Sequence, residues 1–98
     1  MRSNFPYNAN RTEELDVDTT GVTITLNSVG PYAEYREFLF DNRDNTNTLL
    51  VLINGMTLNL PAGTFVGLSV AEILHFTLKA ASGTVRVYYI AQGYKKVS

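Results

Sequence analysis

The sequence contains no cysteine, one histidine and few charged residues. Without cysteine, neither a disulfide nor a thiolate metal site can stabilise the fold, and a single histidine excludes any site that needs two imidazoles. Charged residues make up 17% of the chain, against about 25% in an average protein. The formal net charge is -1, so no strong field exists to attract nucleic acid or an anionic membrane surface.

Long hydrophobic runs are also missing. No window approaches the run of about 18 apolar residues that spans a bilayer, and residues 1–10 lack the apolar region of a signal peptide. We therefore expect a soluble protein made in the cytoplasm, with no membrane partner. A chain of 98 residues forms one domain, and a domain of this size is marginally stable unless a well-packed core or oligomerisation supports it.

The chain does contain apolar residues that alternate with polar ones. Val22, Ile24 and Leu26 alternate with polar residues, and Phe38 and Phe40 would share one face of a later strand. A hairpin is expected at residues 54–55, because Asn-Gly suits the positive φ that both central residues of a type I′ turn need. The sequence therefore predicts an all-β fold, a small antiparallel β-sandwich or jelly roll of about seven or eight strands.

Three segments are less regular. Residues 33–37 could begin a helix, although the phenylalanines that follow indicate a strand. Residues 64–69 and 70–79 are predicted as two strands, the second with Leu74 on the same face as two other apolar residues. Residues 1–12 are polar, and we interpret them as a flexible N-terminal arm that precedes a β-sandwich domain of residues 13–98.

Two features indicate binding to a partner. Phe5 and Tyr7 are aromatic residues in the polar arm, where they either have no role or anchor the arm on a partner. In residues 49–53 both faces are apolar, and Leu50 and Leu52 form the face opposite the core. A loop or the arm could cover this second face. We favour a subunit interface, because the chain is small, low in charge and without disulfides.

No arrangement of residues indicates catalysis or a cofactor. His75 has no nucleophile or base at catalytic spacing. The acidic loop at residues 41–47 fails the calcium-loop pattern at its third, sixth and twelfth positions. Asp16 and Asp18 could share a cation, but charges on an edge strand more commonly discourage aggregation. We therefore predict a non-enzymatic protein with no catalytic, cofactor-binding or metal-binding residues.

Residues 48–93 resemble small β-sandwich virion proteins of tailed bacteriophages. The likeness lies in an apolar strand, a hairpin, a Leu-Pro-Ala-Gly turn at residues 60–63 and a final Ser-Gly-Thr-Val strand at residues 82–85. Such proteins act as head decoration or cement proteins, as adaptors or as parts of fibres, and they are commonly homotrimers that clamp neighbouring capsid subunits. The resemblance implies a capsid decoration protein located in the virion. Its partners would be other copies of itself and the major capsid protein.

The tyrosines leave a second function open. Aromatic rings can stack on sugars, so a β-sandwich with several exposed tyrosines could be a carbohydrate-binding module. The residues that could serve in this way are Tyr32, Tyr35, Tyr88, Tyr89 and Tyr94. A role as a phage adaptor or fibre component is also open.

Overall fold

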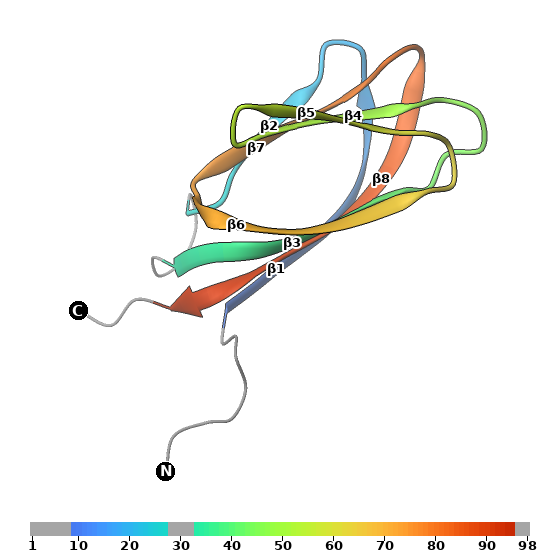
Figure 1. The fold of residues 1–98 in the computed structure, drawn as a ribbon. Coiled ribbons are helices and arrows are strands. Elements are labelled where there is room, and N and C mark those ends of the chain that lie inside the picture. The colour runs from blue at the N-terminus through green and yellow to red at the C-terminus, as the bar shows by residue number, and fades with distance from the viewer. Residues whose placement is uncertain (1–8, 28–32, 96–98) are drawn as a thin grey trace.

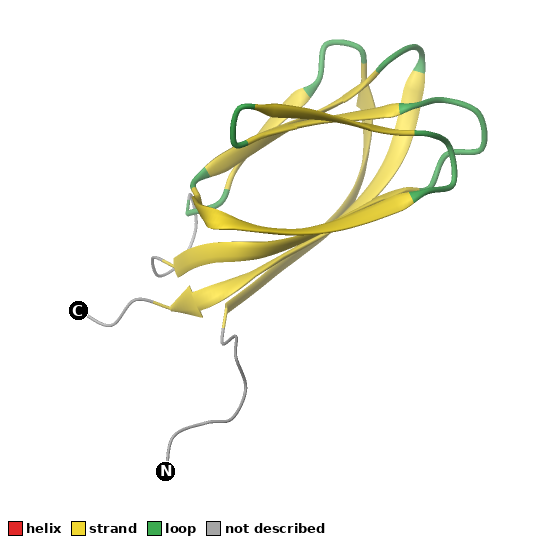
Figure 2. Ribbon diagram, in the orientation of Figure 1, coloured by secondary structure: helices red, strands yellow, loops and turns green. Residues whose placement is uncertain are grey.

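The computed structural model describes residues 9–27 and 33–95, which form eight strands and no helix (Figures 1 and 2). The strands are β1 (Ala9–Asp18), β2 (Val22–Thr25), β3 (Ala33–Asn42), β4 (Leu49–Ile53), β5 (Met56–Leu60), β6 (Phe65–Ile73), β7 (His75–Ala80) and β8 (Thr84–Lys95). One sheet, called sheet A below, has the order β1-β8-β3-β6, and the other, sheet B, has the order β2-β7-β4-β5. The predicted all-β sandwich is confirmed.

The strands pair as one long antiparallel hairpin rolled into two layers. β1 pairs with β8, β2 with β7, β3 with β6 and β4 with β5. β3 also pairs with β8, and β4 also pairs with β7, so the four strand pairs join into two sheets of four strands. This nested arrangement of eight strands is that of a jelly roll. Figure 1 shows the two sheets facing each other.

Four aromatic rings fill the centre of the core between the sheets. Phe38 and Phe40 stack with their ring centroids 6.0 Å apart, so the shared face predicted for them is confirmed. Phe76 packs edge-on against Phe40 and against Tyr89, with centroid distances of 5.0 Å and 5.1 Å. Edge-to-face packing brings the positive edge of one ring to the negative face of another and adds to the stabilisation from burial.

The predicted hairpin between β4 and β5 is also confirmed. Asn54 has a φ of 53° and Gly55 a φ of 74°, which are the left-handed conformations of a type I′ turn. Ile53 pairs with Met56 directly beside this turn. The short turn therefore fixes the register of β4 against β5.

β3 is a strand throughout, but it contains a β-bulge at Arg36. Its register against both neighbouring strands shifts between Tyr35 and Glu37. Before the bulge Ala33 and Tyr35 are buried, and after it the buried series continues from Phe38. The bulge adds one residue and so changes which residues face the core. This extra residue explains the irregular pattern of the segment in the sequence.

The connection between β6 and β7 differs from the prediction. β6 ends at Ile73 and β7 begins at His75, so a single residue, Leu74, links sheet A to sheet B. The prediction of one strand over residues 70–79, with Leu74 on the same face as Phe76 and Leu78, was wrong. Leu74 is 52% exposed, and its carbonyl accepts a hydrogen bond of 2.9 Å from the Leu26 N–H. A corner this short leaves the apolar pattern unbroken, so the sequence does not mark it.

β1 starts earlier than predicted, because residues 9–12 belong to the strand and not to the arm. Ala9 is buried, and Arg11 Nη1 donates hydrogen bonds to the carbonyl oxygens of Thr25 and Leu26 at 2.8 Å and 2.9 Å. These bonds tie sheet A to the end of β2. Polar residues on an edge strand lack the apolar alternation that marks a strand in the sequence.

Candidate binding face and groove

The two sheets differ in charge. The four strands of sheet B contain a single charged residue, Lys79. On sheet A, Arg86 pairs with Glu14 at 3.0 Å and with Asp16 at 3.3 Å, and Arg43, which follows β3, lies 3.6 Å from Glu14. Charged residues are depleted at the centres of protein interfaces. The outer face of sheet B is therefore the better candidate for contact with a partner.

β4 lies in the interior of sheet B and has two apolar faces. Leu49, Val51 and Ile53 are buried in the core, so Leu50 and Leu52 lie on the outer face. Leu50 is half-buried, whereas Leu52 is 38% exposed. The two-sided strand predicted from the sequence is thus confirmed in its geometry, and its outer side remains open to solvent at Leu52.

Threonine side chains surround Leu52 on the outer face. Thr57 of β5 and Thr77 of β7 pair with Leu52 from either side. Thr23 of β2 continues the row, with its hydroxyl 2.9 Å from the Thr77 hydroxyl. Threonine offers both a methyl group and a hydroxyl. This row can therefore form apolar contacts and hydrogen bonds with a partner without removing many charges from water.

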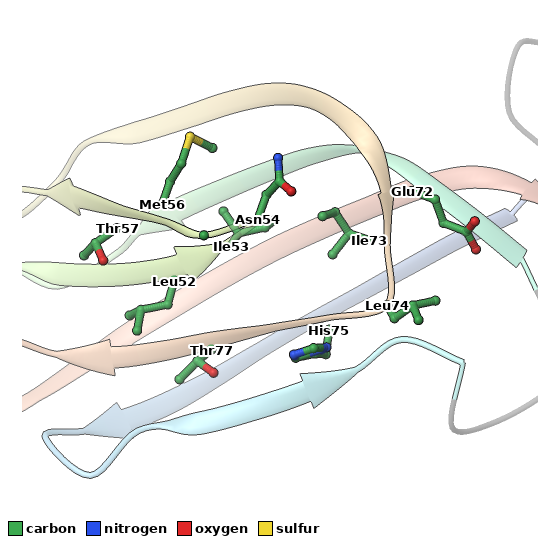
Figure 3. A pocket seen from close by; sticks show the side chains of 11 residues that line it. Leu52, Ile53, Asn54, Met56, Thr57, Glu72, Ile73, Leu74, His75 and Thr77 are labelled. Carbon is green, nitrogen blue, oxygen red and sulfur yellow. The ribbon is translucent and has the colours of Figure 1, made fainter.

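A groove of about 530 Å³ lies at one end of this face, between the β4–β5 hairpin and the β6–β7 corner (Figure 3). Leu52, Met56 and Leu74 line it, and these are three of the five large hydrophobic side chains that are exposed among the described residues. Exposed apolar side chains gathered in a concave surface mark a binding site. The face and the groove together form the candidate site.

The polar lining of the groove suits recognition of a partner. Glu72 and His75 are the titratable residues that line it, and Asn54, Thr57 and Thr77 supply uncharged hydrogen-bonding groups. The arrangement can hold an apolar side chain between the hairpin and the corner, with hydrogen bonds at its rim.

The structure places the residues predicted to bind a partner as follows. Leu52 lines the groove, and Leu50 lies on the same outer face, outside the groove. Phe5, Tyr7 and Tyr32 lie outside the described residues. Leu52 therefore connects the predicted apolar face to the groove.

Sequence reasoning missed Met56 and Leu74. Met56 directly follows the type I′ turn and is 40% exposed, so its place beside a tight turn is a signal that could have been used. Leu74 gives no such signal, because its alternation with Phe76 and Leu78 predicts one continuous strand. The two residues approach the same groove only because the β4–β5 hairpin lies beside the β6–β7 corner (Figure 3).

The acidic side chains considered as cation ligands have other partners. The Asp44 carboxylate accepts hydrogen bonds from the N–H groups of Asn47 at 2.7 Å and Thr46 at 3.0 Å, and these bonds lower the pKa of Asp44. Asp18 accepts bonds from the backbone of the turn that follows it, and Asp16 pairs with Arg86. Within residues 9–27 and 33–95, no group of three potential metal ligands is close enough to hold an ion.

The tyrosines within the described part of the chain do not form an exposed platform. Tyr35 and Tyr89 are buried in the core. Tyr88 lies beneath the guanidinium group of Arg43, whose Cζ is 4.7 Å from the ring centroid. Tyr94 is 44% exposed near the end of β8. A sugar-stacking surface needs open ring faces, and two of the tyrosines considered for it are part of the core.

Comparisons with known proteins add no relative. No protein-family model matches the chain, and no curated protein matches its sequence. The part of the chain that the structure describes has no helix long and apolar enough to cross a membrane. The case for function therefore depends on the face and the groove of sheet B.

Proposed function

We propose that this chain is a non-enzymatic structural protein of a tailed bacteriophage virion, which decorates the capsid and binds capsid subunits through the outer face of sheet B. The observation that carries the proposal is the nearly uncharged outer face with an exposed apolar groove at its end. Interface centres use such apolar anchors and exclude charge. The jelly roll recurs in viral capsid domains, and the resemblance of residues 48–93 to virion proteins supports the same role.

The groove suggests how a capsid subunit is held. An apolar side chain of the subunit would insert between Leu52 and Leu74, and the hydroxyls of Thr57 and Thr77, which lie on the same face as Leu52, would bond to its backbone. Full burial of one leucine-sized side chain contributes about 1.5–3 kcal/mol. Loss of a single anchor of this size would weaken binding roughly ten- to a hundred-fold.

The proposal includes self-association and an anchoring arm. The resemblance to homotrimeric decoration proteins implies three copies, and Phe5 and Tyr7 would extend the contact with the major capsid protein. A truncation should stop at residue 8, because β1 begins with the buried Ala9. Deleting residues 1–8 should leave the fold intact and abolish docking on the parent particle. Unchanged docking would remove the arm from the proposal.

The face itself is tested with a charge placed at its centre. Leu52→Asp puts a carboxylate on the outer face of sheet B, and Thr12→Asp makes the same change in net charge on the exposed surface of sheet A. Both positions are exposed, so both variants should fold. We expect the wild type and Thr12→Asp to be recovered in gradient-purified virions and Leu52→Asp to be at least about ten-fold depleted.

The amount of each variant in the virion is measured by quantitative mass spectrometry of purified particles. If the wild-type chain were absent from purified virions, the proposed virion role would be refuted. If Leu52→Asp were incorporated as well as Thr12→Asp, the chain would be bound through a surface other than the outer face of sheet B.

A further inference from the structure

Three of the four edge strands have features that prevent pairing with another strand. β2 has only four residues, and β5 has five and is followed by Pro61. Short length, proline and charge are the devices that keep sheet edges from pairing with other chains. β1 uses charge, through Arg11, Glu13, Glu14, Asp16 and Asp18.

The greater part of β6, the fourth edge strand, lacks these features. Residues 65–71 contain no charged residue and no proline. Val66, Leu68 and Val70 pack against the core, and Phe65 is 70% exposed. β6 is the end strand of sheet A, paired with β3 on one side only. A long, apolar edge of this kind is a template for an added strand.

The backbone of β6 presents hydrogen-bonding groups at this edge. The Asn42 N–H donates to the Thr64 carbonyl at 2.9 Å, and the direction of bonding alternates along an antiparallel pair. Thr64, Val66 and Leu68, which lie opposite Asn42, Phe40 and Phe38, therefore bond to β3, and the register against β3 shifts beyond Ser69. Phe65, Gly67 and Ser69, which alternate with them, direct their N–H and C=O groups to the open edge.

We propose that β6 is an interface between two copies of this chain. The two β6 strands pair antiparallel across a two-fold axis at Leu68, which joins the two four-stranded A sheets into one continuous sheet. On the outer face this register puts Phe65 opposite Ala71 and Gly67 opposite Ser69. Phe65, the one large side chain of this set, thus faces a small one, and the outward backbone groups of Gly67 and Ser69 gain partners.

The strand that pairs with the open edge of β6 is β6 of a second copy, because its sequence is complementary to itself. On the inner face, Val66 lies opposite Val70 and Leu68 lies opposite Leu68 of the second copy, so the apolar layer continues across the junction. No charge within residues 65–71 opposes another. This pairing uses a different surface from the proposed capsid contact and does not depend on it, since residues 65–71 do not line the groove.

The register is tested by disulfide cross-linking. The native chain has no cysteine, so each single substitution introduces one thiol. In Leu68→Cys the two thiols face each other in a non-hydrogen-bonded pair, where the Cα atoms lie about 4.5 Å apart and a disulfide can form. In the control Val66→Cys the two thiols lie roughly 13 Å apart along the strands. Under mild oxidation we expect a linked dimer from Leu68→Cys and none from Val66→Cys.

The association itself is tested by the solution mass from light scattering over a dilution series. We expect the wild type to have twice the 10.9 kDa mass of one chain, or six times if two trimers are joined. Gly67→Lys places like charges beside the axis and should halve that mass. Gly67→Ala should keep it, because a Cβ at this position meets only the Phe38 carbonyl oxygen, at 3.7 Å. Both variants are checked for folding by thermal unfolding.

Equal cross-linking of both cysteine variants would overturn the register. A wild-type mass of one chain, or a mass that Gly67→Lys leaves unchanged, would overturn the pairing. A trimer in which Leu68→Cys does not cross-link would also overturn it, and would leave the proposed virion role intact.

Discussion

Asn42, at the end of β3, is the one polar side chain among the described residues that is fully buried. Its Nδ2 donates to the carbonyls of Asn47 and Leu60, both at 2.9 Å, and its Oδ1 accepts from the Asp44 N–H at 2.9 Å. Asn42→Ala removes the partner of all three groups, and each buried group left unsatisfied costs about 1–3 kcal/mol. We expect the free energy of unfolding in urea to fall by about 3 kcal/mol.

Asn59 provides the control for this prediction, because it lies exposed on the outer face of β5. Asn59→Ala should change the free energy of unfolding by no more than about 0.5 kcal/mol. A loss of similar size in both variants would show that Asn42 has no special role in joining β3, the following loop and the end of β5.

Tyr89 makes the free energy of unfolding depend on pH in the alkaline range. Burial raises the pKa of this phenol, and its hydrogen bond of 2.8 Å to the Glu13 carboxylate raises it further, to about 12. A tyrosine in the unfolded chain ionises near pH 10, so the folded state keeps this proton to higher pH than the unfolded state. The stability that the neutral phenol contributes is complete below about pH 10 and is lost between about pH 10 and pH 12.

Tyr89→Phe removes this ionisation. We expect its free energy of unfolding to fall less than that of the wild type between pH 10 and pH 12, by on the order of 2–3 kcal/mol. Urea unfolding at a series of pH values measures the difference. Parallel curves for the two proteins would show that Tyr89 ionises alike in the folded and unfolded chains.

At the scale of elements, the bulge in β3 requires a glycine in β8. A Cβ at Gly93 would lie 1.9 Å from the Glu34 carbonyl oxygen and 2.7 Å from the Tyr35 Cα, and these backbone atoms cannot move without disturbing the strand pair. We expect Gly93→Ala to lower the free energy of unfolding by about 3 kcal/mol or more. Gly67→Ala should change it by less than about 0.5 kcal/mol, because its Cβ makes only ordinary contact with the Phe38 carbonyl. Urea unfolding of the pair tests this, and equal effects would contradict it.

The strands that could be predicted are those in which every second residue enters the core. β2, β4 and β8 have this pattern, and the Asn-Gly turn is specific because few residues tolerate two consecutive positive φ angles. Prediction failed where the backbone interrupts the alternation. The bulge at Arg36 adds a residue, the corner at Leu74 changes sheets within one residue, and the polar start of β1 looks like a loop.

Part of the candidate site could be predicted for a related reason. Leu52 is apolar on a side of its strand that the core does not use, and the sequence shows this directly. The groove depends on contacts between segments distant in the chain, namely the hairpin with Met56 and the corner with Leu74. Local patterns contain no information about which hairpin will lie beside which corner.

At the scale of the whole molecule, the nested pairing requires distant parts of the chain to meet. β1 pairs with β8 along its full length, although nearly the whole sequence separates them. Folds dominated by such non-local pairs close large loops before contacts form, and they refold in milliseconds to seconds. We expect refolding in this range after dilution from urea, followed by tyrosine fluorescence. Refolding in microseconds would contradict the dependence on non-local pairing.

The same pairing has a mechanical consequence. Ala9 lies opposite Gly93, so the start of β1 lies beside the end of β8. A force that pulls these two ends apart breaks the hydrogen bonds between β1 and β8 one residue pair at a time. We therefore expect this pair to separate at a low force. A force applied to the outer face of sheet B is shared by four strands at once. The domain should therefore unfold at a lower force when it is pulled by its two ends than when the load acts on the outer face of sheet B.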